Sequence, residues 1–154
     1  MLACSLISKY LAFAFLSAAN AFSHNVAVFP FVNYAPFCVL QSRIHDRWSS
    51  FFSSTLEDRQ GYRPSDCFET FPFPEGFETR PQLEAAGKEY YEFRAALMVR
   101  HNEGLTKTYN RFHDPNDRSA EIQRLSMGAS KPATHGRFKT SHGYGVLVSF
   151  RISM

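Results

Sequence analysis

Cysteine is scarce in this chain of 154 residues, and the cysteines present stand far apart. Cys4, Cys38 and Cys67 are odd in number and about thirty residues from one another. A disulfide framework or a zinc site needs ligands in pairs at short spacing. We therefore expect reduced, partly buried thiols. The Asn-x-Ser/Thr glycosylation signal is also missing.

The motifs that mark a complete enzyme are missing as well. There is no Asn-Pro-Pro-aromatic run, which holds a flipped base in base-modifying enzymes. No lysine has Asp or Glu two positions before it, as one common nuclease site requires. A phosphate loop, a His-Glu-x-x-His motif and a full Gly-x-Gly-x-x-Gly are absent, and the six histidines lack metal-ligand spacing. We expect no catalytic residue, no metal ligand and no cofactor site in this chain.

Acidic side chains are missing from residues 126–154, which contain four basic ones. These are Lys131, Arg137, Lys139 and Arg151. Because the net charge of the whole chain is +3, the positive excess belongs entirely to that segment. Charge alone therefore gives no reason to expect nucleic-acid binding by residues 1–125. With 44% hydrophobic and 20% charged residues, the chain has enough apolar surface to fold.

Charge is also scarce in residues 1–42, where Lys9 is the single formally charged side chain. An apolar run at 10–16 leads into Ala19-Asn20-Ala21, a pattern typical of a signal peptide. One alternative is therefore a small exported α+β binding protein that loses residues 1–21. The uncharged run is too short for a bilayer, which takes about 20 apolar residues. We favour a buried β-hairpin with strands at 7–16 and 26–31.

The next segment predicts a helix followed by a strand. Apolar side chains recur every three or four residues from 34 to 52, which places them on one helix face, with Asn33 as N-cap. Residues 53–62 are expected to form a single strand, on which side chains alternate between two faces. The side chains predicted to share one face of that strand are Glu57, Arg59 and Gly61.

The segment 63–74 has too many prolines for a helix and too many aromatic residues for a free linker. We expect it to be extended and docked on a surface. Its anchoring side chains would be Phe68, Phe71 and Phe73.

Three helices are expected in the second half of the chain. The first begins with the capping box Thr79 and Gln82 and ends at 102–104. Its apolar stripe consists of Leu83, Ala86, Tyr90, Phe93 and Leu97. Shorter helices are expected at 106–113 and 120–125. After residue 125 no period is sustained, and only 146–152 has the composition of a strand, so we predict an α+β fold with an irregular tail.

Several of these runs together resemble the C-terminal third of MmeI-like type II restriction-modification proteins. The runs are Ser8-Lys9-Tyr-Leu-Ala-Phe-Ala-Phe-Leu16, Val28-Phe-Pro-Phe31, Val39-Leu-Gln-Ser-Arg-Ile-His45, Ser53-Ser-Thr-Leu56, Arg63-Pro-Ser-Asp-Cys-Phe-Glu-Thr-Phe-Pro-Phe-Pro74 and Gly104-Leu-Thr-Lys-Thr-Tyr-Asn110. Members of this family are large bacterial chains that join a nuclease, an adenine-specific DNA methyltransferase and a target-recognition domain.

The resemblance covers about 8–125 and no catalytic domain. It implies that residues 1–62 are the end of a DNA target-recognition domain and that 63–125 form a helical C-terminal domain. It also implies a cytoplasmic protein whose partners are double-stranded DNA and a methyltransferase domain or chain. S-adenosylmethionine and Mg²⁺ would belong to the missing domains.

In that family, bases are read partly from the stretch between the Ser-Ser-x-Leu and Pro-Ser-Asp motifs. The residues at these positions here are Glu57, Asp58, Arg59 and Gly61. Arginine can bond guanine O6 and N7, and glutamate can accept from cytosine N4, so this pair suits a G·C base pair. An ordinary surface ion pair between Glu57 and Arg59 is the alternative. The candidates for phosphate contacts are Arg43, Arg47 and Arg63.

The chain departs from the family pattern after Leu125. The family continues with a Leu-His-x-x-Met-Asp helix and a Tyr-Gly-Trp, whereas this chain reads Ser126-Met-Gly-Ala-Ser. A reading-frame change is the simplest hypothesis for 126–154. We interpret the chain as a fragment with exposed apolar edges, poor solubility and weak specific DNA binding, or none, when isolated. A stand-alone subunit that completes its fold on a separate methyltransferase chain is a third possibility.

Overall fold

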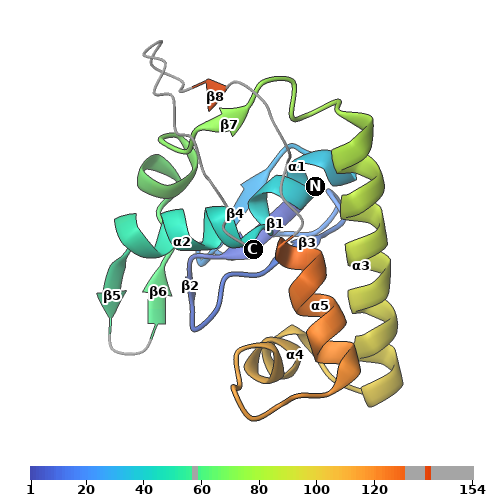
Figure 1. The fold of residues 1–154 in the computed structure, drawn as a ribbon. Coiled ribbons are helices and arrows are strands. Elements are labelled where there is room, and N and C mark those ends of the chain that lie inside the picture. The colour runs from blue at the N-terminus through green and yellow to red at the C-terminus, as the bar shows by residue number, and fades with distance from the viewer. Residues whose placement is uncertain (57–58, 131–137, 140–154) are drawn as a thin grey trace.

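The computed structural model describes residues 1–56, 59–130 and 138–139, and it has an α+β fold (Figure 1). Small antiparallel sheets occupy the first part of the chain, and helices follow. The predicted fold class is confirmed. In the described part of the chain, no helix combines the length and the apolar character needed to cross a bilayer.

The first sheet consists of β1 (Leu2–Ser5), β3 (Phe13–Phe15) and β4 (Val26–Phe29), in the order β3-β1-β4. The predicted hairpin of 7–16 with 26–31 is wrong, because β1 lies between its two arms and pairs with both. The apolar run at the start of β1 suits this central position, which is covered on both edges.

The second sheet consists of β2 (Ile7–Ser8), β5 (Ser54–Leu56) and β6 (Arg59–Gly61), in the order β2-β6-β5. The predicted single strand at 53–62 is wrong, since the segment folds back into a hairpin with Ser54 opposite Gly61 and Leu56 opposite Arg59. The predicted alternation of faces along one strand therefore does not apply across the turn.

Two helices occupy the place of the single predicted helix at 34–52. They are α1 (Tyr34–Leu40) and α2 (Arg43–Phe52). The break falls at Ser42, whose hydroxyl accepts a hydrogen bond from the His45 backbone N–H and caps α2. Asn33 is the N-cap of α1 by position, but its side chain donates to the Glu78 carbonyl and does not cap the helix.

The docked segment is packed as expected but is not extended throughout. Its first part is one turn of π-helix, η1 (Pro64–Phe68), and its last part is strand β7 (Phe73–Pro74), which pairs with β8 (Phe138–Lys139). Phe71 is only 3% exposed, and both Phe68 and Phe73 pack against the core, which confirms the anchoring residues.

Three helices complete the fold, namely α3 (Pro81–His101), α4 (Leu105–Phe112) and α5 (Ala120–Ser130). The predicted capping box is wrong, since Arg80 is the N-cap of α3 and no side chain caps it. Helix α5 continues past the predicted end at 125, because Ala129 extends the buried face begun by Ile122 and Leu125. The expected strand at 146–152 lies outside the described residues.

One apolar core joins the strands to the helices. It contains Leu2 and Phe13 of the first sheet, Phe37 of α1, Tyr62 after β6, and Leu125 of α5. Figure 1 shows α3 and α5 together on one side of the first sheet, with α2 and the β5–β6 hairpin on the other side. The core therefore holds α2 and the base of the hairpin in a defined position.

Candidate nucleic-acid interface

Arg59 is the predicted base-reading side chain that the structure describes most fully. It is exposed and is the first residue of β6, next to the turn of the hairpin. Gly61 is partly buried and pairs with both Ile7 and Ser54 at the other end of β6. Glu57 and Asp58 lie outside the described residues.

The base of the hairpin is anchored to the body of the protein. Gln60 Nε2 donates to the hydroxyls of Ser49 and Ser50 on α2, at 3.0 and 3.1 Å. The backbone N–H of Tyr62 donates to the Leu6 carbonyl at 2.8 Å, and the Tyr62 ring is buried. Figure 1 shows β5 and β6 on the side of the molecule away from the helices α3 and α5. The hairpin is thus a projecting β-ribbon with a fixed base.

Two of the three predicted phosphate-binding residues lie together. Arg43 and Arg47 are exposed and occupy positions i and i+4 of α2, which share one face of a helix. Arg43 donates to the Ser126 hydroxyl, and its guanidinium carbon lies 5.8 Å from the centre of the Phe112 ring.

Arg63 is separated from the other predicted phosphate contacts. It is the N-cap of η1, beyond the end of β6 that is opposite to Arg59. Its guanidinium lies 4.0 Å from the Asp66 carboxylate, which offsets part of its charge. The structure therefore places Arg43 and Arg47 in one group and Arg63 in another.

Three further residues lie together in the fold although no sequence pattern grouped them: Lys9, Tyr10 and His113. The Tyr10 and His113 rings are stacked, with centroids 4.0 Å apart and planes 6° from parallel, and the Lys9 ammonium lies 5.5 Å from the Tyr10 ring centre. One sequence feature distinguishes this group, since Lys9 is the single charged side chain of residues 1–42. The spacing of apolar residues does not predict that His113 contacts Tyr10, since about a hundred residues separate them in the sequence.

The buried polar groups are structural. His45 is fully buried, and burial lowers the pKa of its ring to about 3, so it is uncharged at neutral pH. Its Nε2 lies 3.0 Å from the Tyr62 hydroxyl. Burial also raises the pKa of the Cys4 thiol to about 12, which makes it unreactive. Neither group has the exposure that a catalytic side chain needs.

Arg94 is the most deeply buried cation of the described residues and closes the free edge of β3. Its guanidinium donates to the Phe13 carbonyl at 2.8 Å and to the Tyr109 hydroxyl at 3.0 Å. Gln41 Oε1 accepts from the Phe13 backbone N–H at 2.8 Å. These side chains bond the outward-facing backbone groups of Phe13, as a neighbouring strand would.

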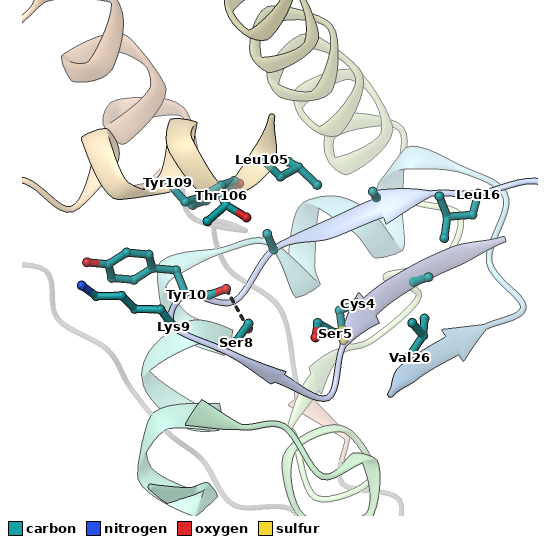
Figure 2. Close-up of a pocket in the computed structure, with 13 residues that line it drawn as sticks. Cys4, Ser5, Ser8, Lys9, Tyr10, Leu16, Val26, Leu105, Thr106 and Tyr109 are labelled. Atoms are coloured by element: carbon teal, nitrogen blue, oxygen red, sulfur yellow. Dashed lines mark hydrogen bonds between the residues drawn. The ribbon is translucent and has the colours of Figure 1, made fainter. Parts of the chain in front are cut away.

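A cavity of about 310 Å³ lies between the first sheet and α4 (Figure 2). Its lining is mostly apolar and includes Cys4, Leu16, Val26 and Leu105. The Ser8 hydroxyl at its rim already donates to the Tyr10 carbonyl at 2.9 Å. Figure 2 shows the Lys9 and Tyr10 side chains at one end of the cavity, beneath α4 and away from Val26. The cavity lacks the convergent polar groups typical of a cofactor site.

Among the described residues, no group of three or more His, Cys, Asp or Glu side chains is placed to hold a metal ion. No protein-family profile, curated protein or solved structure matches the chain. The candidate site consists of a projecting hairpin with an exposed arginine, beside a cationic face of α2. This arrangement is the physical basis for the function proposed below.

Proposed function

We propose that this chain is a DNA-recognition fragment of a bacterial restriction-modification protein with adenine-specific DNA methyltransferase activity. The observation that carries the proposal is the position of Arg59, exposed near the turn of a β-hairpin whose base is bonded to α2. The sheet has three strands, but β2 pairs only with Gly61 and Gln60, so Arg59 lies beyond the residues that β2 covers. A two-stranded β-ribbon, as at this end of β6, has the width to enter the major groove of DNA. Arg59 would donate two hydrogen bonds to a guanine there.

The remaining contacts divide between bases and phosphates. Glu57, Asp58 and Gly61 belong to the same hairpin sequence, and Glu57 would accept from the cytosine paired with that guanine. Arg43 and Arg47 present two cations on one face of α2, next to the hairpin base, and would contact phosphates. Arg63 would be a weaker phosphate contact, because Asp66 lies beside it.

A separate methyltransferase domain or chain would carry out the adenine methylation. S-adenosylmethionine, and Mg²⁺ for cleavage, would bind there. Several large apolar side chains are exposed, among them Val32, Phe51 and Val99, each at least 78% exposed. They lie on three separate segments, so the proposal of a partner domain rests on the family resemblance and not on one contiguous apolar patch.

The DNA on both sides of the gene tests the claim that this is a fragment. An upstream frame that encodes Asn-Pro-Pro-aromatic, with Leu-His-x-x-Met-Asp downstream in a shifted frame, is the expected result. Flanks that encode neither motif would contradict the claim and favour an independent product.

Binding of a fluorescent DNA duplex at low salt tests the claim of DNA recognition. Arg59→Gln should weaken binding several-fold, because Arg59 is the exposed cation of the hairpin. Lys88→Gln is the matched control, since Lys88 is an exposed cation on α3 whose nearest acid is Glu92. Equal effects of the two variants would contradict a special role for the hairpin.

The basic residues of 126–154 need a separate control because they can bind any polyanion. A chain in which Lys131, Arg137, Lys139 and Arg151 are all glutamine removes that contribution. This variant should keep the difference between Arg59→Gln and Lys88→Gln. Loss of all duplex binding in the variant would show that the tail alone binds DNA, against the proposal.

A further inference from the structure

A basic and aromatic surface lies between the hairpin and α4. We call it the Tyr10 strip and define it by Lys9, Tyr10, Arg43, Arg47 and His113. These residues come from three segments: the turn after β2, the face of α2, and the C-terminal end of α4. The sequence separates these segments widely, and the fold brings them together.

The register of the second sheet connects the strip to the hairpin. Ile7 pairs with Gly61 and Ser8 with Gln60, and Lys9 is the first residue after β2. The Ser8 hydroxyl donates to the Tyr10 carbonyl at 2.9 Å and holds the turn that follows β2. Figure 2 shows Lys9 and Tyr10 extending in the same direction from this turn. The strip therefore begins at the end of the strand that pairs with β6, whose first residue is Arg59.

Stacking and charge connect the other end of the strip to α2. His113 is the C-cap of α4, and its ring covers one face of Tyr10 at 4.0 Å. Burial, followed by the charges of Arg43 and Arg47, lowers the pKa of His113. Arg43 also lies over the ring of Phe112, the neighbour of His113.

The strip carries more positive than negative charge. None of the ion pairs among the described residues involves Lys9, Arg43 or Arg47. Two acids are near. Asp46 lies on α2 between the arginines, where burial raises the pKa of its carboxyl, and exposed Asp114 follows His113. The cations of the strip are thus available for an anionic ligand.

We propose that the Tyr10 strip binds the phosphate backbone of one DNA strand, next to the groove that the hairpin enters. This inference rests on the proposed function. Lys9 supplies a charge, and the Tyr10 hydroxyl and the His113 ring supply hydrogen-bond donors, which are the groups that contact phosphates. Because His113 already covers one face of Tyr10, that face is closed to a nucleobase. The geometry therefore favours duplex phosphates over stacked bases of a single strand.

The salt dependence of duplex binding tests the strip. Each phosphate contact adds about 0.9 to the slope of log K against log salt concentration. Lys9→Gln should therefore lower the slope by about this amount for any duplex sequence, while Lys88→Gln leaves it unchanged. Tyr10→Ala, which removes both the stack and the hydroxyl, should weaken binding most, and Tyr10→Phe, which keeps the stack and removes the hydroxyl donor, should weaken it to a smaller extent. Thermal unfolding midpoints show whether each variant stays folded.

The outcomes separate the strip from the proposed function. If Arg59→Gln weakens duplex binding but Lys9→Gln and Tyr10→Ala do not, phosphate binding by the Tyr10 strip is contradicted and the proposed function is retained. If the chain binds no duplex at low salt, both fail. If single-stranded DNA binds more tightly than duplex, and Lys9→Gln weakens only that binding, the assignment to duplex phosphates is overturned.

Discussion

Gly87 of α3 lies against the backbone of Tyr34 in α1, so closely that a Cβ atom on Gly87 would be 2.2 Å from the Tyr34 carbonyl oxygen. No real Cβ approaches a backbone atom at that distance, so only glycine fits without a shift of one helix. This contact sets how near α1 and α3 pack, and through α1 it positions α2 and the candidate interface.

Gly87→Ala should destabilise the protein. Alanine stabilises a helix by about 1 kcal/mol relative to glycine, but overpacking against backbone typically costs about 1–3 kcal/mol or more. The cost of the clash therefore exceeds the gain in helix propensity. We expect the free energy of unfolding in urea to fall by about 1–2 kcal/mol. Gly104→Ala is the control, because a Cβ there meets nothing within 4 Å. Equal stability of the two variants would show that α1 and α3 are not in close contact.

Stability should fall on mild acidification because of His45. Burial lowers the pKa of His45 to about 3 in the folded protein, whereas the unfolded chain protonates it near the ordinary value of about 6.5. Below that pH the unfolded state binds a proton that the folded state excludes. The free energy of unfolding should therefore drop by up to about 1.4 kcal/mol per pH unit between about pH 6.5 and 5.

Urea unfolding of His45→Phe over the same pH range isolates this contribution. The phenylalanine ring fits among Phe13, Tyr62 and Phe71, which surround His45, and does not titrate. Its stability should depend less steeply on pH than that of the wild type. An identical slope in His45→Phe would contradict the buried, neutral state of this ring.

Arg94→Ala should be strongly destabilising. The change leaves the Phe13 carbonyl without its buried donor and opens a cavity beneath Tyr109, so we expect a loss of about 3 kcal/mol or more. Arg100→Gln on the same helix removes an exposed ion pair with Glu121 and should cost about 1 kcal/mol or less. Chemical denaturation of both variants gives the comparison. A small effect at Arg94 would mean that the edge of β3 is not closed by this side chain.

Removal of residues 1–21 should unfold the chain. This segment supplies β1, β2 and β3, including the buried side chains of Leu2, Cys4, Leu11 and Phe13. Circular dichroism of the shortened chain should show loss of ordered structure. Mass spectrometry of the protein from its natural host then separates the two interpretations of this segment. A mature protein that starts after residue 21 and remains folded would favour the exported binding protein.

Sequence patterns predicted elements better than their pairing. The spacing of apolar residues located α3, α4 and two of the three strands of the first sheet, β3 and β4, because helix and strand periods are local properties. The partner of a strand is not a local property. The apolar residues at 2–4 suit a central strand but do not identify its partners, and residues 57–58, between β5 and β6, include no glycine or proline that would predict a break in the strand.

The candidate site was predictable only in part, for the same reason. Arg43, Arg47 and Arg59 stand out in the sequence as cations on predicted elements. The predicted apolar stripe of α3 included Ala86 and Phe93, whereas the structure buries Gly87 and Arg94. The grouping of Lys9, Tyr10 and His113 depends on tertiary packing between distant segments, which periodicity does not encode.

Sequencing of the duplexes that the chain retains from a randomised library at low salt tests the central claim most directly. We predict a weak enrichment of G·C at one position with the wild type, its loss with Arg59→Gln, and its retention with Lys88→Gln. The same enrichment in Arg59→Gln as in the wild type, or no retained duplex at all, would contradict base reading by the β5–β6 hairpin.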